Sequence, residues 1–241
     1  MKAFINDLPG PAQNIVKRAY RRFQRAYGIP LRPYGRTRLS IGVKPLSVAW
    51  GADRGQEIAR FYLEELFLRE FVEDIQGHCL EFYADQYTLR FGKKHRVTKI
   101  DVLNVEHGLP RTTIRADLTK PNDIADNTFD CIICTHVLHM IYEFDKAIAD
   151  LHRILRPGGV LLIAVPQVSM SSDYWSDLWR FTETGLRATL ARSFDDKNIT
   201  MRAYGNSLTA AGYLRGLAAH EFSKRELNNH DKQFAVEICA R

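Results

Sequence analysis

Acidic and imidazole side chains follow several of the predicted strands in this 241-residue chain. Asp101 closes one predicted strand and lies 20 residues after Glu81, where an acid commonly binds the hydroxyls of a ribose. Asp117 lies at the end of a later strand, although an acid there is also typical of a helix N-cap. His136 follows a further buried run, and its imidazole can exchange a proton near neutral pH. Neither acid is specific for a ligand alone, but the two at this spacing support each other.

The cysteines and carboxylates give no indication of a metal or redox centre. Cys131 and Cys134 are spaced as C-x-x-C, but side chains three residues apart on a strand point to opposite faces of the sheet. All four cysteines fall in predicted buried strands, as is natural in a reducing compartment. The acids and histidines lack the spacing of a ligand set, so no metal is expected.

The stretch around His136 predicts a parallel βαβ unit. Residues 131–134 form a short apolar run, typical of a strand that is buried on both faces. Apolar residues recur at helical spacing over 144–155, and Pro157-Gly158-Gly159 follow as a stop signal. Residues 160–165 then predict a second buried strand. Two such strands joined by a helix form a right-handed crossover.

The same stretch resembles the second half of the class I S-adenosylmethionine-dependent methyltransferases. The most recognisable part is L-x-R-I-L-R-P-G-G-V-L-L, which here occupies residues 151–162. The alternative is an ordinary βαβ unit of another doubly wound protein. The resemblance extends from about Trp50 to the C-terminus. It implies an α/β fold, a Rossmann-like seven-stranded and mostly parallel sheet with helices on both faces, and S-adenosylmethionine as the cofactor.

The resemblance also locates the loop that should follow the first strand. In most of the family this strand ends in E/D-x-G-x-G-x-G, whose glycines let the backbone approach the cofactor. Aligned on Glu81, the three glycine positions hold Tyr83, Asp85 and Tyr87. A subset of the family has L-E-I-G-x-x-x-Y-T-x-x-F-G, which this chain matches at Leu80-Glu81, Tyr87-Thr88 and Phe91-Gly92, whereas Tyr83 replaces its glycine. The glycine-rich motif is therefore degenerate.

The remaining cofactor contacts are implied by family position. Asp101 would bind the ribose, while Asp117 and the backbone of Leu118 would read the amino edge of the adenine. His136 lies in the loop that faces the methyl group in the family, and it is the candidate general base for a hydroxyl acceptor. His139, nearer the helix, is interpreted as a core histidine. The implied cofactor-binding set is Glu81, Tyr83, Asp101, Asp117, Leu118 and His136.

Two further stretches resemble members that act in sugar and polysaccharide pathways. One is W-G-A-D-R-G at residues 50–55, which either folds over a ligand or forms a polar turn. The other ends in W-R-F-T, where Tyr174 and Trp179 would stack on a sugar ring and Arg180 would bind an anionic group. The alternative is that Trp179 anchors the following helix to the sheet.

The charge distribution divides the chain into two parts. Residues 1–52 hold ten Lys or Arg and one acid, whereas the rest of the chain has a charge of −3. We therefore separate a basic helix and linker, residues 1–49, from a methyltransferase domain, residues 50–241. The predicted helix 12–27 is basic and amphipathic, so it either lies on an anionic membrane or packs on the domain. No nucleic-acid-binding signature accompanies the charge, and neither a secretory signal nor a membrane span is evident.

Taken with the resemblance, these features predict a cytoplasmic O-methyltransferase, peripheral at the inner membrane face, that acts on a saccharide hydroxyl in glycan biosynthesis. One alternative is a methyltransferase for another small molecule. Another is a catalytically silent methyltransferase fold that serves as a binding or scaffold protein, which the missing glycines favour. Retention of Asp101, Asp117 and His136 favours an enzyme. The lack of G-x-G-x-x-G disfavours a nicotinamide dehydrogenase, and no oligomeric state is predicted.

Overall fold

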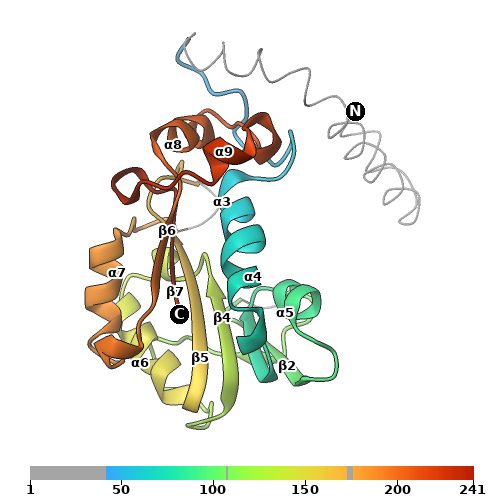
Figure 1. The fold of residues 1–241 in the computed structure, drawn as a ribbon. Coiled ribbons are helices and arrows are strands. Elements are labelled where there is room, and N and C mark those ends of the chain that lie inside the picture. The colour runs from blue at the N-terminus through green and yellow to red at the C-terminus, as the bar shows by residue number, and fades with distance from the viewer. Residues whose placement is uncertain (1–41, 107, 173–175) are drawn as a thin grey trace.

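The computed structural model describes residues 42–106, 108–172 and 176–241. The predicted helix 12–27 and the candidate residue Tyr174 lie outside the described residues. Figure 1 shows a central sheet with helices on both sides and a cluster of short helices at one end.

Seven strands in the described part form one sheet, in the order β3-β2-β1-β4-β5-β7-β6. β1, β2, β3, β4 and β5 are parallel, and β7 pairs antiparallel with both β5 and β6. The predicted fold class is confirmed. The strands are β1 (Gly77–Phe82), β2 (Val97–Asn104), β3 (Ile114–Arg115), β4 (Phe129–Thr135), β5 (Leu155–Pro166), β6 (Met201–Tyr204) and β7 (Glu237–Ala240).

Helices cover both faces of this sheet (Figure 1). One face carries a continuous helical stretch followed by α5, the other carries α6 and α7, and α8 and α9 lie at one end. The α-helices are α3 (Ile58–Phe61), α4 (Leu68–Glu70), α5 (Gln86–Phe91), α6 (Phe144–Ile154), α7 (Glu183–Leu190), α8 (Ser207–Leu214) and α9 (Lys224–Leu227). The π-helical η1 (Tyr62–Phe67) joins α3 to α4, and the 3₁₀ turns are η2 (Val72–Asp74), η3 (Leu138–Met140), η4 (Asp196–Asn198), η5 (Ala219–Glu221) and η6 (Lys232–Phe234).

The alternation of side chains along β4 supplies a core on each face. Cys131 and Ile133 pack under α3, η1 and α5, whereas Ile132 and Cys134 pack under α6 and α7. The two cysteines thus belong to different cores, as predicted from the period of a strand. The four cysteines are buried and free.

The βαβ unit from β4 to β5 is present as predicted, with one difference at its turn. β5 begins at Leu155, directly after α6, so that Pro157–Gly159 lies inside the strand rather than in a separate turn. The pairing with β4 is irregular between Phe129 and Cys131, which accommodates these residues. Gly158 has φ 79°, a conformation that other residues rarely adopt.

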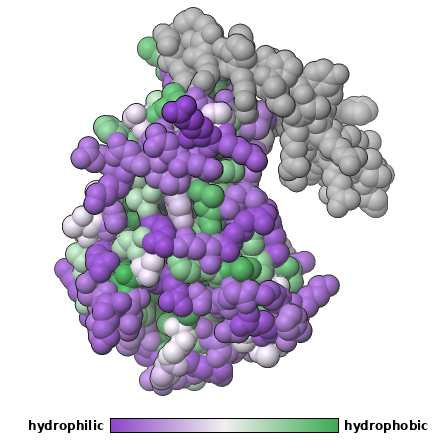
Figure 2. All heavy atoms as spheres, viewed as in Figure 1, coloured by the Kyte–Doolittle hydropathy of each residue, from purple (hydrophilic) through white to green (hydrophobic). Residues whose placement is uncertain are grey.

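One other boundary differs from the sequence prediction, because β2 continues beyond Asp101 to Asn104. Polar side chains cover most of the face shown in Figure 2, with small apolar areas between them. Within the described residues, no helix has the length and apolar character that a bilayer crossing requires.

Candidate active site

A cavity of about 330 Å³ lies at the carboxyl ends of β1, β4 and β5. Phe82 and Tyr83 line it from the end of β1, His136 from the loop after β4, and Pro166 from the end of β5. The strand order reverses between β1 and β4, since β2 lies beyond one and β5 beyond the other. Open α/β sheets bind ligands at such a switch point. The cavity is therefore the candidate active site.

Residues other than glycine that have a left-handed backbone are concentrated around this cavity. Trp50, Tyr83 and His136 line it with φ values of 53°, 68° and 55°. Elsewhere in the described residues, only Arg111 and Asn127 combine a side chain with a positive φ. This conformation is costly for an L residue and persists where the surroundings hold it, commonly at functional sites.

The loop after β1 keeps a glycine-like backbone at one of the three glycine positions. Tyr83 has φ 68°, and its side chain is 54 % exposed beside the cavity. Asp85 has φ −94° and directly precedes α5, while Tyr87 is already inside that helix. Neither of these two positions requires a glycine. The backbone that a glycine would adopt is therefore retained where the loop leaves the strand.

The carboxylate of Glu81 binds the start of α5 and does not line the cavity. It accepts hydrogen bonds from the N–H groups of Tyr87 and Thr88, at 2.9 and 2.8 Å, and from the Thr88 hydroxyl at 2.9 Å. Burial raises the pKa of Glu81 to about 7, although the hydrogen bonds from Thr88 and Tyr87 act in the opposite direction. Glu81, on which the family motif was aligned, thus holds α5 against β1.

The prediction that Asp101 closes its strand was wrong. β2 continues to Asn104, so Asp101 lies inside the strand, where it is 4 % exposed. Its Oδ2 lies 2.6 Å from Nε2 of His78 and 2.7 Å from Nζ of Lys99. Burial alone would raise the pKa of Asp101, but these partners keep it below its ordinary value. The acid that follows the end of β2 is the exposed Glu106.

Asp117 and Leu118 follow β3, at the carboxyl end of the sheet as predicted. Asp117 accepts hydrogen bonds from the N–H and the hydroxyl of Thr119, at 3.0 and 2.7 Å, and lies 2.9 Å from Nζ of Lys120. Lys120 first and then Thr119 lower the pKa of Asp117 to about 2. Leu118 is buried in the core. Neither residue lines the cavity.

His136 lies in the cavity wall as a neutral imidazole. Its backbone N–H donates to the carbonyl of Ala164 on β5 at 2.8 Å, which fixes the turn after β4. Burial, followed by the nearby His139 and Arg60, lowers the pKa of His136 to about 3. Its Nε2 lies 3.3 Å from Oε1 of Glu237 on β7. A neutral imidazole is the form that can accept a proton.

His139 also lines the cavity, although most of its side chain is buried as expected of a core histidine. Its carbonyl accepts hydrogen bonds from the N–H groups of Leu178 and Trp179, both at 3.0 Å. Its Nε2 lies 3.8 Å from Oδ1 of Asp177. Burial lowers the pKa of His139 to about 4. His139 therefore connects η3 to the segment before α7.

Trp179 and Arg180 lie outside the cavity lining. The indole of Trp179 donates to the carbonyl of Ile141 at 3.0 Å and packs on Phe144, with ring centroids 5.5 Å apart. Arg180 binds Asp177 at 2.7 Å and the carbonyl of Met170 at 3.2 Å. The contacts of Trp179 attach the segment before α7 to the start of α6.

Trp50 supplies the aromatic surface of the cavity instead. Its indole donates to the hydroxyl of Ser169 at 3.1 Å. The hydroxyl of Ser47 donates to Asp53 and accepts from the N–H of Gly51 at 3.3 Å. Gly51 has φ 82°, and a Cβ there would lie 2.7 Å from a backbone oxygen. The W-G-A-D-R-G stretch is thus a polar turn that presents Trp50 to the cavity.

Several polar residues at the cavity had no local motif that could identify them. Glu57 and Arg60 come from the start of the α3 stretch, and Tyr213 from α8. Glu237 lies directly behind His136. The sequence signal that could have identified Glu237 is its position in the apolar strand 235–240, because acidic residues are rarely fully buried unless they are paired. In the described residues, no group of three or more His, Cys, Asp or Glu could hold a metal ion.

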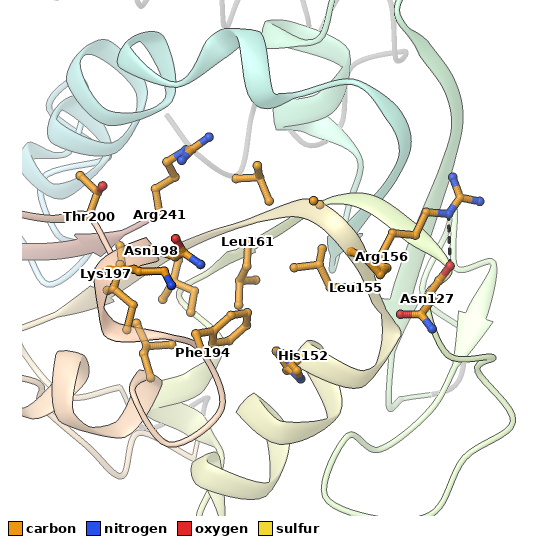
Figure 3. Close-up of a pocket in the computed structure, with 18 residues that line it drawn as sticks. Asn127, His152, Leu155, Arg156, Leu161, Phe194, Lys197, Asn198, Thr200 and Arg241 are labelled. Atoms are coloured by element: carbon orange, nitrogen blue, oxygen red, sulfur yellow. Dashed lines mark hydrogen bonds between the residues drawn. The ribbon is translucent and has the colours of Figure 1, made fainter.

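A second hollow of about 670 Å³ lies where β5 begins (Figure 3). Its charged groups are engaged: Arg156 binds Asp130 at 2.9 Å, and Arg241 binds Asp74 at 2.7 Å. Phe194 lies beside the strand as part of an apolar wall. The hollow is distant from the carboxyl ends of the parallel strands, so it is not the candidate active site.

Comparison with known proteins identifies the central part of the chain. The family described as "Methyltransferase domain" matches residues 77–163, from β1 into β5. A stretch of 74 residues is 34% identical to "Probable polyketide synthase 10" of Dictyostelium discoideum, covering 29% of this chain and 3% of that protein. A stretch of 39 residues is 46% identical to "Ubiquinone/menaquinone biosynthesis C-methyltransferase UbiE" of Haemophilus ducreyi, covering 16% and 15%. The chain thus spans a small part of the length of these curated relatives.

Two solved structures illustrate the likeness in three dimensions. An S-adenosylmethionine-dependent methyltransferase from Archaeoglobus fulgidus has a TM-score of 0.49 and 11% identity, over 74% of this chain and 91% of that one. A putative methyltransferase of the same class from Listeria monocytogenes has a TM-score of 0.48 and 12% identity, over 76% and 96%.

Proposed function

Because residues 77–163 match the family described as "Methyltransferase domain", we propose that this chain is a class I S-adenosylmethionine-dependent methyltransferase, which transfers a methyl group to an acceptor in the switch-point cavity. The observation that carries the proposal is the position of His136. A neutral imidazole lines the cavity in the loop after β4, which in this class faces the methyl group. The proposal therefore joins a family match to a site that can accept a proton.

S-adenosylmethionine supplies a methyl group that is already activated on a sulfonium. The part left to the protein is alignment of the acceptor and, for a hydroxyl, removal of one proton. We assign the proton removal to His136. Trp50 and His139 line the same cavity and would hold the acceptor beside it.

The loop after β1 supports binding of the cofactor. Tyr83 holds the left-handed backbone that glycine provides in the family, so the loop can turn above the strand ends in the same way. At the end of β2, the proposed partner of the ribose is Glu106 in place of Asp101. Asp117 and Leu118 keep their proposed role at the adenine.

A saccharide is the acceptor that we favour. The flat indole of Trp50 suits the apolar face of a sugar ring. Glu57, Arg60, Gln86 and Asp177 line the same cavity and provide hydrogen-bond partners for ring hydroxyls. This lining supports an O-methyltransferase of glycan biosynthesis, with the aromatic role moved from Trp179 to Trp50.

An aromatic carbon or phenol is the second candidate acceptor. The observation that favours it is the 46% identity over 39 residues to a protein named as a C-methyltransferase of ubiquinone and menaquinone biosynthesis. An aromatic ring could also stack on Trp50. The two candidates differ in the chemistry of the product and can be separated by it.

Calorimetry with S-adenosylmethionine and its demethylated product tests the cofactor proposal. We expect binding with a dissociation constant below about 1 mM. Transfer of a labelled methyl group to a panel of oligosaccharides, phenols and carboxylates then tests the acceptor. Failure to bind the cofactor would favour a silent scaffold, whereas binding with transfer only to phenols would refute the saccharide.

Exchange of Trp50 for alanine should separate acceptor binding from cofactor binding. The Trp50→Ala variant should keep its cofactor affinity and raise the KM for the acceptor at least about tenfold, because a stacking face is lost. Trp179→Ala is the matched control, since its indole packs on α6 outside the cavity. It should lower thermal stability with little change in KM. The reverse pattern would restore Trp179 as the acceptor residue.

A further inference from the structure

Glu237 is an ionisable side chain that is fully buried in the fold. It lies on β7 with 0% exposure, and neither of its carboxyl oxygens has a hydrogen-bond partner among the described residues. Nε2 of His136 is also buried without a hydrogen bond and lies 3.3 Å from Oε1 of Glu237. Among the described residues, His136 is the only basic side chain within ion-pair distance of this carboxylate. Burial of a carboxylate is costly unless it is paired, so the position indicates a role for the pair.

Resting on the function proposed above, we propose that Glu237 is the positioning residue of His136. In its ionised form, the carboxylate accepts a hydrogen bond from Nε2–H, whose nitrogen lies 3.3 Å away, and the lone pair of the imidazole is then on Nδ1. Nε2 is the nitrogen enclosed beside β7, so Nδ1 is the one that can meet an acceptor in the cavity. An imidazole held in one tautomer by a buried carboxylate is a general device for proton abstraction.

The proton balance of the step is simple. The acceptor hydroxyl gives its proton to Nδ1 while its oxygen forms the new bond to the methyl carbon. The electron pair of the broken carbon–sulfur bond remains on sulfur. The resulting imidazolium lies against the negative carboxylate of Glu237, which offsets its charge, and the proton then leaves to solvent.

Other charged and titratable groups surround the pair and influence the pKa values of its two side chains. His139 faces His136 with ring centroids 6.2 Å apart, and Arg60 acts on His136 from α3. Glu57, at the start of α3, acts on Glu237. Tyr213 from α8 and Cys239 from β7 also interact electrostatically with Glu237.

Together these surroundings favour a neutral pair at low pH. Burial raises the pKa of Glu237, whereas burial lowers the pKa of His136 to about 3. At low pH the carboxyl group of Glu237 is therefore protonated, and the ring of His136 is neutral. The carboxyl O–H then donates a hydrogen bond to Nε2, and the single proton of the ring is on Nδ1. Loss of the carboxyl proton as the pH rises moves the ring proton to Nε2. The pair thus gains its base form with increasing pH.

The tautomer of His136 provides a test that needs no acceptor. Long-range ¹H–¹⁵N correlation spectra of the full-length labelled protein distinguish the two tautomers, with His136→Gln used for assignment. In the wild type we expect a change from Nδ1–H to Nε2–H as the pH is raised from about 5 to about 9, a range in which buried carboxyl groups with a raised pKa lose their proton. Glu237→Gln should abolish this change, because the amide does not titrate. A wild-type ring that keeps one tautomer over that range, or a variant that still changes, would overturn the proposal.

Cys239→Ala is the matched control, since Cys239 is also buried on β7. It should keep the wild-type change of tautomer. If it abolishes the change as well, the cause is the packing of β7 and the role of Glu237 is refuted. Glu237→Met is a second variant at this position, with an apolar side chain, and it should also abolish the change of tautomer. Calorimetry of S-adenosylmethionine should give the wild-type affinity within about twofold for Glu237→Gln, Glu237→Met and Cys239→Ala. Loss of cofactor binding in the wild type would refute the proposed function independently of the tautomer result.

Discussion

At the residue scale, the left-handed backbone of Tyr83 is a local cost that the fold retains beside the cavity. Tyr83→Gly would relieve this strain, about 1–3 kcal/mol, against a glycine entropy cost of about 0.5–1 kcal/mol. The side chain is 54 % exposed, so little burial is lost. We therefore expect the free energy of unfolding to stay equal or rise, and cofactor affinity to increase, measured by urea unfolding and calorimetry.

Asp85→Gly is the matched control for this exchange because it also restores a family glycine. Asp85 has a negative φ, precedes α5 and pairs with Arg111. A glycine there relieves no strain, so the variant should lose about 0.5–1 kcal/mol. Equal losses in both variants would show that the backbone at Tyr83 is not strained.

The acid at the end of β2 supplies a second test at this scale. Glu106→Gln should weaken S-adenosylmethionine binding about tenfold, since a charged hydrogen-bond acceptor for the ribose is lost. Asp101→Asn should leave the affinity nearly unchanged, because its carboxylate is engaged by His78 and Lys99. Calorimetry of both variants decides between them, and a larger effect at Asp101 would restore the original assignment.

His136 could be predicted from the sequence, and its partner could not. The histidine lies in the loop of a βαβ unit whose residues are close in the chain, so spacing alone locates it. Glu237 reaches it only through the antiparallel pairing of β7 with β5, in which Pro166 lies opposite Glu237. The misplacement of Asp101 has a different cause, since alternation along a strand does not define where the strand ends.

At the scale of elements, α5 depends on a side chain from the strand before it. Glu81 accepts two backbone N–H groups and one hydroxyl at the start of this short helix. Glu81→Ala would leave these buried donors without partners, at a cost of about 2–4 kcal/mol in the free energy of unfolding. Urea unfolding measures the loss.

Glu73→Ala is the control for this element, because Glu73 also binds two neighbours, Lys93 and Arg96, but on the surface. Exposed pairs contribute little, so its loss should be much smaller than that of Glu81→Ala. A similar loss for both variants would mean that Glu81 is not needed to hold α5.

The elements that the sequence predicted best are those with strong periodicity. The apolar face of α6 follows the helical period and is buried as expected. β3 is short because only Ile114 and Arg115 keep the register with β2. A strand at the edge of a sheet has one neighbour to fix its length, and the apolar pattern does not record that.

At the scale of the whole molecule, the order of the strands creates the site. β1 and β4 are adjacent in the sheet although far apart in the chain, so their loops and the start of α3 meet around one cavity. The family resemblance predicted the seven-stranded, mostly parallel sheet, which composition and periodicity alone do not determine. It brings together Trp50, Tyr83 and His136, the three cavity residues with left-handed backbone.

The uneven charge of the molecule leads to the last prediction. Ten of the 34 Lys and Arg residues fall within residues 1–52, and the sequence predicts a basic amphipathic helix at 12–27. We propose that this segment associates with the anionic inner face of a membrane, where each basic residue contributes up to about 1 kcal/mol. Neutralisation of Lys17, Arg18, Arg21, Arg22 and Arg25 to Gln in the full chain should therefore weaken vesicle binding more than about tenfold.

Sedimentation with phosphatidylserine-containing vesicles measures this binding, which should also fall with added salt. The matched control neutralises five exposed lysines of the domain instead: Lys94, Lys120, Lys146, Lys197 and Lys224. Because these are scattered over the surface, their loss should reduce vesicle binding far less, although both proteins change by the same charge. Equal reductions would show that net charge, and not the helix, drives association. Reduced thermal stability in the first variant alone would instead mean that the helix packs on the domain through its basic residues, and the membrane role would then be wrong.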